Sequence, residues 1–195
     1  MARRAPRPPT RLLDPEARGT VAVAASRNET LAALETACSM ELAGPADRHA
    51  TVARALNAML RSFDAQLAAQ TIAFPLAVWT QGIWTMIEDP RDSLPGDAGA
   101  LERLAEMARS QVVGRIARSR DGCYGFAYYD EGRCRRLFLK VADAVIEDEG
   151  RLDEEEPPIR VDPRACIDAA WRRLIPETEP TDIEVRLYRP TGVVP

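Results

Sequence analysis

Alternation of apolar and polar positions is clearest over residues 111–141, which read QVVGRIARSRDGCYGFAYYDEGRCRRLFLKV. Two glycine-containing pairs divide this stretch, Asp121-Gly122 and Glu131-Gly132. Asp-Gly between two runs of strand-forming residues is a strong hairpin signal, because the tight turn that joins two strands needs positive φ angles. The stretch therefore predicts three antiparallel strands joined by two tight turns.

A second turn with two central residues sets the register of the last two strands. It pairs Asp130 with Arg133, and Phe126 then faces Leu137 across the strands. Pairs of aromatic and aliphatic residues on one side of a sheet are the contacts that fix such a register. The opposite side, which carries Tyr129, is mixed in polarity. We therefore expect one face of this sheet to be well buried and the other to be partly covered.

Apolar residues that recur every three or four positions predict helices elsewhere in the chain. The first two predicted helices are separated only by a short turn at Gly44-Pro45. Two amphipathic helices joined in this way predict an αα-hairpin over residues 28–70. The predicted helices cover residues 28–42, 46–69, 98–110 and 162–174.

Shorter runs rich in β-branched and aromatic residues predict further strands at residues 72–79, 83–87 and 183–188. Together these elements predict an α+β fold. We expect an antiparallel sheet with helices packed on one face and the N-terminal helical hairpin beside it. The sheet and its helices are expected over residues 72–189.

Residues 1–18 differ from the rest, since they combine Arg and Pro with few apolar side chains. Such a segment cannot bury enough surface to offset the entropy lost on ordering. It predicts a disordered Arg/Pro-rich arm, followed by a single domain over residues 19–195. The functional alternative for the arm is contact with nucleic acid or with an acidic partner.

Composition narrows the class of protein. The chain has 195 residues, of which 46% are hydrophobic and 29% charged, as is usual for a soluble domain with one main core. No apolar run approaches the roughly 20 residues needed to span a bilayer, and the start lacks the apolar region of a secretory signal. Four scattered cysteines without CxxC spacing indicate reduced thiols, so we expect a cytoplasmic protein. Lys140 is the only lysine among 26 basic residues, which indicates a bacterial source.

Acidic residues crowd one later segment, and the net charge of −4 disfavours a dedicated nucleic-acid binder. The segment has no glycine pivot at the spacing of a calcium-binding EF-hand loop. It predicts a solvated loop over residues 143–156, with a basic surface of a protein partner as the functional alternative. The partner-binding residues expected within it are Asp148, Glu149, Asp153, Glu154, Glu155 and Glu156, with Asp143 and Glu147 completing the acidic run.

Candidate chemistry is sparse. His49 is the only histidine, so a metal site of the usual histidine kind is not expected. The chain contains no phosphate-binding loop, no dinucleotide fingerprint and no nucleophile elbow. We predict no catalytic residue, no metal and no cofactor. Trp79, Trp84 and Tyr188 are a candidate aromatic cluster for a ligand. The candidate ligand-binding residues of an aromatic pocket are Trp79, Trp84 and Tyr124.

The order of these features resembles a group of small, uncharacterised bacterial α+β proteins. The resemblance covers residues 72–158 and is carried by a tryptophan-containing strand pair, a helix, the turn motif S-x-D-G-x-Y-G-F-A-Y-Y-x-x-G-x-x-R and a Gly/Glu-rich segment. These pieces are Trp79 and Trp84, residues 101–110, residues 119–135 and residues 150–157. The resemblance implies an α+β fold, a cytoplasmic bacterial protein and an immunity-type or unknown function. It carries no catalytic residue across.

Three functions remain open from the sequence. The first is a non-enzymatic bacterial interaction protein of immunity type that binds a cationic protein through the acidic loop. The second is a small-molecule-binding or enzymatic domain with an aromatic pocket, and the third is a nucleic-acid binder that uses the Arg-rich arm. The sequence does not determine the oligomeric state.

Overall fold

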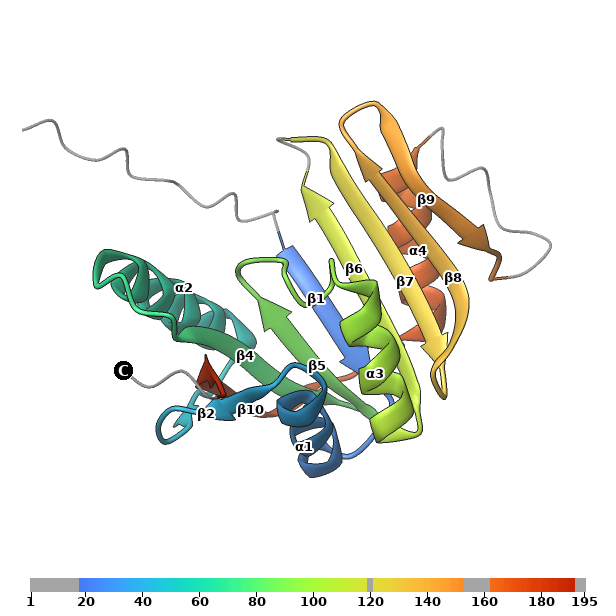
Figure 1. Ribbon diagram of the computed structural model, residues 1–195. Helices are drawn as coiled ribbons and strands as arrows, with labels where there is room; N and C mark the ends of the chain where they lie inside the picture. Colours follow the sequence, from blue (N-terminus) through green and yellow to red (C-terminus); the bar gives the residue numbers. More distant parts are fainter. Residues whose placement is uncertain (1–17, 119–120, 153–161, 192–195) are drawn as a thin grey trace, which may run out of the picture.

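A computed structural model of the chain describes residues 18–118, 121–152 and 162–191 (Figure 1). The predicted disordered arm over residues 1–18 lies outside these residues, except for Arg18 at the start of the first strand. Within the described part, helices and strands build on one large antiparallel sheet, which confirms a mixed helix and strand fold.

The described residues form ten strands in one sheet, in the order β2-β10-β4-β5-β1-β6-β7-β8-β9, with β3 also pairing with β10. Every neighbouring pair is antiparallel. The strand bounds are β1 Arg18–Val23, β2 Met40–Leu42, β3 Asp47–Arg48, β4 Phe74–Gln81, β5 Trp84–Asp89, β6 Gln111–Arg118, β7 Cys123–Asp130, β8 Arg133–Val141, β9 Ala144–Gly150 and β10 Pro180–Pro190.

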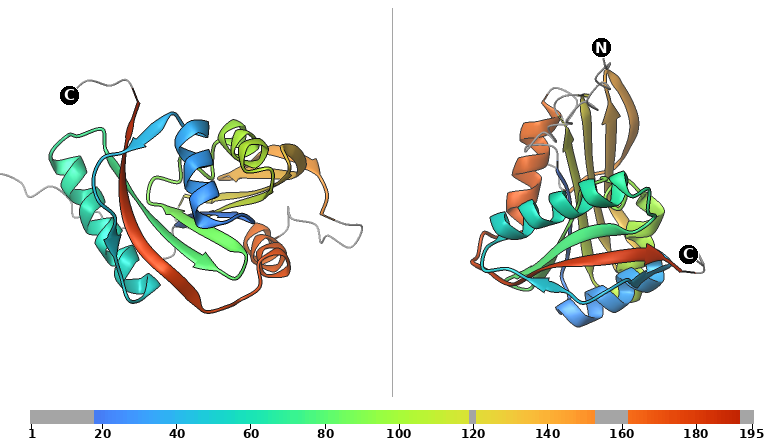
Figure 2. Two further views of the ribbon diagram at one scale, coloured as in Figure 1. Left: turned by 90° about the horizontal axis from the view of Figure 1, so that it is seen from below. Right: turned by 90° about the vertical axis from the view of Figure 1, so that its left-hand side faces the viewer.

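Four helices in the described part lie on both faces of this sheet: α1 Arg27–Ala37, α2 Val52–Ala68, α3 Ala98–Ala108 and α4 Pro163–Leu174. One core lies between the sheet and the pair α1 and α3, and a second core lies between the sheet and the pair α2 and α4 (Figure 2). The prediction that helices pack on one face was therefore wrong. The central strands are apolar on both sides, and a sheet of that kind needs cover on both faces.

The helix starts follow from local chemistry. Ser26 and Glu29 form a capping box at the start of α1, and Thr51 caps the first turn of α2. Asp97 and Asp162 accept from backbone N–H groups at the starts of α3 and α4. Each side chain satisfies a donor that the first helical turn leaves unpaired.

The predicted αα-hairpin over residues 28–70 is not present. Strands β2 and β3 lie between α1 and α2 in the chain, and the two helices pack on opposite faces of the sheet. Gly44-Pro45 connects these two short strands, both of which pair with β10. Pairing with a strand more than a hundred residues later is a long-range interaction that the local helical pattern does not contain.

Strands β6, β7 and β8 confirm the predicted meander, and Asp130 pairs with Arg133 as expected. The register then shifts by one residue at a bulge that contains Arg135, so that Phe126 faces Phe138. The predicted partner of Phe126, Leu137, lies on the opposite face. At a bulge, two residues of one strand lie opposite one residue of its partner. Each residue of β8 beyond the bulge therefore points to the other face of the sheet from the one predicted.

Both faces of β7, the middle strand of the meander, carry buried side chains. Phe126 belongs to the core under α2 and α4, and Tyr129 belongs to the core under α1 and α3. The exposed fractions of the two residues are 2% and 4%. The expected difference between a buried face and a mixed face is therefore absent at these positions.

Two further expectations concern the environment of the chain. All four cysteines are free thiols. No helix in the described ranges is long and apolar enough to cross a membrane.

Candidate functional site

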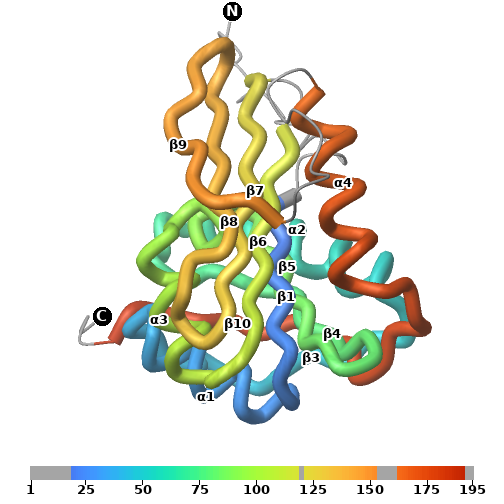
Figure 3. The backbone as a smooth tube through the Cα atoms, turned by 90° about the vertical axis from the view of Figure 1, so that its right-hand side faces the viewer, coloured from blue at the N-terminus to red at the C-terminus, as the bar shows by residue number. Residues whose placement is uncertain are grey.

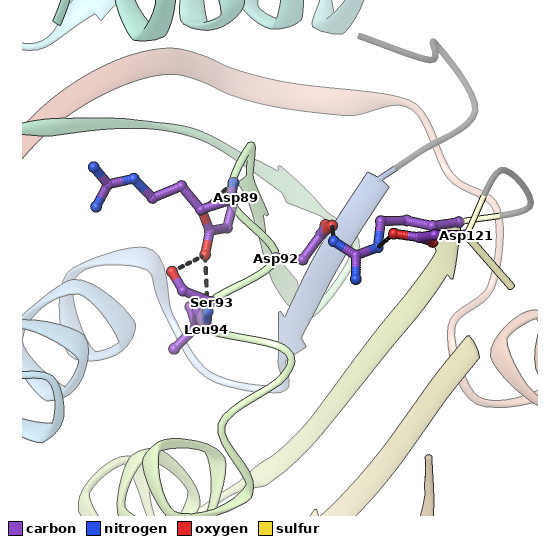
Figure 4. A network of polar contacts seen from close by, with 7 residues as sticks. Asp89, Asp92, Ser93, Leu94 and Asp121 are labelled. Atoms are coloured by element: carbon purple, nitrogen blue, oxygen red, sulfur yellow. Dashed lines mark hydrogen bonds and ion pairs between the residues drawn. The ribbon is translucent and has the colours of Figure 1, made fainter. Parts of the chain in front are cut away.

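The loop between β5 and α3 is organised around the carboxylate of Asp89, the last residue of β5. Asp89 is 2% exposed. Its Oδ1 accepts from the Arg91 backbone N–H at 2.9 Å, while its Oδ2 accepts from the Ser93 hydroxyl at 2.7 Å and from the Leu94 N–H at 2.8 Å (Figure 4). A buried Asp that accepts from its own following loop fixes the conformation of that loop.

Beside Asp89 lies a cavity of about 260 Å³ between the end of α1, the start of α3 and the sheet. Its apolar wall is formed by Met40, Phe74, Leu76, Leu94 and Ala100. Its polar wall is formed by Cys38, Ser39, Asp89, Ser93, Asp97 and Arg103. The lining thus combines apolar side chains with convergent polar groups, and both are needed in a small-molecule site.

The thiol of Cys38 in this cavity is not poised for nucleophilic chemistry. Burial raises its pKa to about 11, an effect that Arg103 opposes and that the carboxylates of Asp97 and Asp89 reinforce. The reactive form of cysteine is the thiolate, which needs a lowered pKa at neutral pH. The polar wall is therefore suited to binding rather than to covalent catalysis by Cys38.

A second polar cluster connects the same loop to the β6–β7 turn. Arg118 Nη1 lies 3.4 Å from Asp92 Oδ2, and Arg118 Nε lies 3.4 Å from Asp121 Oδ2 (Figure 4). Burial raises the pKa of Asp92 to about 6; Arg118 opposes this shift, and Asp89 and Asp121 add to it. The ionised form of Asp92 is thus disfavoured in the folded protein despite its ion pair.

This shift predicts a pH dependence of stability. The pKa of Asp92 in the folded protein, about 6, lies above its ordinary value of 3.8. Folding therefore favours the protonated form, and that stabilisation is present below about pH 4 and is lost as the pH rises through about 6. Between pH 4 and pH 8, wild type should lose roughly 2–3 kcal/mol more free energy of unfolding than Asp92→Asn, since Asn does not titrate. Urea unfolding of both proteins at the two pH values measures this difference, and parallel pH profiles would contradict the prediction.

The acidic segment is placed differently from the prediction. Residues 144–150 form strand β9 rather than a solvated loop, while Asp143 lies in the turn before it. Glu147, Asp148 and Glu149 lie on the strand. The other expected partner-binding residues, Asp153, Glu154, Glu155 and Glu156, lie outside the described residues. Strand β9 is the outermost strand of the sheet, and no described strand pairs with its outer edge (Figure 3).

A buried arginine holds β9 against β8. Arg136 is 2% exposed, and its Nη1 donates to the carbonyl oxygens of Leu137 at 2.9 Å and Glu149 at 3.0 Å. The same nitrogen lies 3.0 Å from Asp148 Oδ1. Asp148 therefore takes part in the fold itself, whereas Glu147 and Glu149 pair with Leu139 and Leu137 in the register and so lie on the opposite face of the strand.

Trp79, Trp84 and Tyr124 lie on one face of the sheet but at different levels, and Tyr188 belongs to the core on the other face. Trp79 and Trp84 both belong to the core under α2 and α4, near the turn between β4 and β5. Tyr124 packs against the same core from β7. Across the paired strands it is level with Arg18, at the start of β1, whereas the two tryptophans are level with the end of β1 near Val23. Trp79 is level with Ala22, so four residues of strand separate it from the level of Tyr124, about 13 Å at the usual rise of a strand. The cavity beside Asp89 lies on the opposite face.

His49 lies next to the edge strand β3, with its Nε2 3.4 Å from Asp47 Oδ2. Among the described residues no group of three or more His, Cys, Asp or Glu side chains is arranged to hold a metal ion.

The cavity residues were not among those predicted. Asp89 could have been found from the local sequence, since Asp followed by Pro, Ser and Gly is typical of a loop in which the carboxylate accepts from later backbone groups. Cys38, Phe74 and Arg103 come from three elements that meet only in the folded protein, and no spacing in the chain brings them together.

Comparison of the chain with protein-family models, with curated proteins and with solved structures gives no match. The resemblance to small bacterial proteins of immunity type therefore stays a prediction.

Proposed function

We propose that this chain is a non-enzymatic interaction protein that binds a basic, extended segment of a partner protein along strand β9. The observation that carries this proposal is the position of β9 as the outermost strand of the sheet, with Glu147, Asp148 and Glu149 along it. An immunity-type role, as the resemblance implies, corresponds to the case in which the basic partner is a toxin.

An outermost strand presents a row of backbone N–H and C=O groups to which another strand can be added. The acidic side chains decide which strand is accepted. A second copy of β9 would bring like charges opposite one another, which is destabilising, whereas a strand with Lys or Arg would pair with them. Carboxylates at the edge also speed the encounter with a cationic partner.

Two features of β9 support its use as a template. Arg136 connects the backbone of Glu149 and the side chain of Asp148 to β8, so the strand is held in position before any partner arrives. Ile146 is 54% exposed and offers an apolar contact among the charges. A preformed edge binds with less loss of conformational entropy than a segment that must first become ordered.

Charge reversal on β9 is expected to weaken this binding. The probe is a fluorescent peptide of alternating Lys and Val, compared with the same peptide carrying central Pro residues and with its Glu-Val counterpart. The Lys-Val peptide should bind wild type, with an affinity that falls as salt is raised. Glu147→Lys with Glu149→Lys should weaken binding by at least about tenfold, measured by fluorescence anisotropy.

The matched control is Glu177→Lys with Glu179→Lys, which changes the net charge equally at exposed positions before β10. It should alter the affinity by less than about threefold, because exposed charges far from the site are screened. Equal loss in both double variants would show that net charge alone attracts the peptide. Equal binding of the Pro-containing peptide would exclude strand addition, because Pro lacks the N–H that the strand must donate.

A further inference from the structure

The charges around the cavity beside Asp89 do not balance. Asp89 is buried, and the three hydrogen bonds that it accepts come from neutral donors, namely two backbone N–H groups and one hydroxyl. Three donors directed at the two oxygens fit an ionised carboxylate. Within the described part of the chain no cationic side chain forms an ion pair with Asp89.

The nearest arginine in sequence is directed elsewhere. The guanidinium of Arg91 lies over the rings of Phe63 and Phe74, at 5.8 and 5.3 Å from their centroids. Its backbone N–H, not its side chain, reaches Asp89. Buried charges in proteins are normally paired with an opposite charge, because an unpaired charge is strongly disfavoured in a poorly polar environment.

The opening of the cavity carries one charge of each sign. Arg103 donates from Nε to the carbonyl oxygen of Ala37 at 3.1 Å, and Asp97 accepts from the Ala100 N–H at 2.9 Å. Both residues are exposed. Together with Asp89, the wall holds two carboxylates and one guanidinium, which leaves an excess of one negative charge.

We infer that the cavity beside Asp89 binds a small organic ammonium compound, with its charged nitrogen at the Asp89 carboxylate and its apolar body against Met40, Phe74 and Leu76. The ammonium supplies the opposite charge that Asp89 lacks. The apolar wall buries a short alkyl or aryl group.

The volume limits the size of this compound. A cavity of about 260 Å³ has the volume of roughly nine water molecules at about 30 Å³ each. This is slightly below the range of about 300–1,000 Å³ usual for drug-sized ligands. Compounds such as hexylamine or phenethylamine match this volume, whereas a nucleotide does not.

Methionine methyl NMR provides a direct test, since Met40 lies in the cavity wall while Met59 and Met86 lie in the core on the other face of the sheet. The probes are phenethylamine and hexylamine, each compared with the alcohol and the carboxylate of the same carbon skeleton. We expect the amines to shift the Met40 signal in a saturable way, with Met59 and Met86 unchanged. The alcohols and carboxylates should bind at least about tenfold more weakly.

Two variants assign the binding to the cavity. Asp89→Asn should weaken amine binding by at least about tenfold, while Asp64→Asn on the exposed side of α2 should leave it unchanged. Ala100→Leu keeps Asp89 and its loop but fills part of the cavity, so it should also reduce amine binding. This second variant shows whether the amine binds in the cavity even if Asp89→Asn does not fold.

Three results would overturn the inference. The first is an absence of saturable shifts at Met40 with either amine. The second is equal binding of amine and alcohol, which would show a purely apolar cavity. The third is undiminished amine binding in Ala100→Leu. None of these results bears on peptide binding at β9, which lies at the edge of the sheet and has a separate probe.

Discussion

Tyr129→Ala is expected to lower the free energy of unfolding by about 3–5 kcal/mol, as much as Phe126→Ala, because each removes a large side chain from a closed core. Tyr129 lies in the core under α1 and α3, and Phe126 lies in the core under α2 and α4. Helices cover both faces of the sheet, so solvent cannot readily fill the space that either substitution leaves. Denaturant unfolding of the two variants measures the losses.

Tyr129→Phe is the control for this prediction, because it keeps the ring and removes only the hydroxyl. Its cost should be no more than about 1.5 kcal/mol, the usual net contribution of one hydrogen bond. If Tyr129→Ala cost less than half as much as Phe126→Ala, the face under α1 and α3 would be less closely packed than the structure shows.

Arg136→Ala is expected to cost about 2–4 kcal/mol, because it removes a buried guanidinium from its ion pair with Asp148, whose side chain is 24% exposed. The substitution also takes the donor away from the carbonyl oxygens of Leu137 and Glu149. Strand β9 should lose protection first, so hydrogen exchange of its amides should rise more than that of β6. Denaturant unfolding gives the total loss, and hydrogen exchange gives its location.

The neighbouring arginine is the matched control. The side chain of Arg135 is 49% exposed, and its Nη2 lies 3.1 Å from Asp130 Oδ2. Exposed ion pairs contribute about 0–1 kcal/mol, so Arg135→Ala should change stability little. Similar losses in the two variants would mean that the burial of Arg136 does not decide its contribution.

Local signals were sufficient to predict most of the elements. The Asp121-Gly122 and Glu131-Gly132 turns gave the meander, since positive φ angles at Gly122 and Gly132 are what these turns require. Asp162-Pro163 marked the start of α4, and the apolar periodicity over residues 98–110 marked α3. In each case the residues that determine the element lie within it or next to it.

Three features of the fold depended on distant residues and were not predicted. The bulge containing Arg135 inserts one residue into β8, which no turn motif encodes. The pairing of β2 and β3 with β10 replaces the expected helical hairpin. The acidic run was interpreted from charge alone, although its first half pairs with β8 at the edge of the sheet.

Of the two candidate sites, the acidic residues could be predicted from the local sequence and the cavity could not. Acidic residues of β9 were recognised because a block of like charge is visible along the chain. The local sequence around Asp89 indicates a loop held by its carboxylate, but it does not show that the carboxylate is buried or that all its hydrogen-bond donors are neutral. A cavity formed by the end of α1, β4 and α3 is a property of packing.

The position of β10 has a consequence for the order in which the protein is made. Strand β10 lies between β4 on one side and β2 and β3 on the other, and these two short strands have no other described partner in the sheet. During synthesis on the ribosome, the backbone groups of β2 and β3 therefore cannot pair with β10 until residues 180–190 have emerged. Until then β4 is also an open edge of the nascent chain. This part of the sheet is completed only after β10 has left the exit tunnel, so a chaperone that shields β4 would act before that moment.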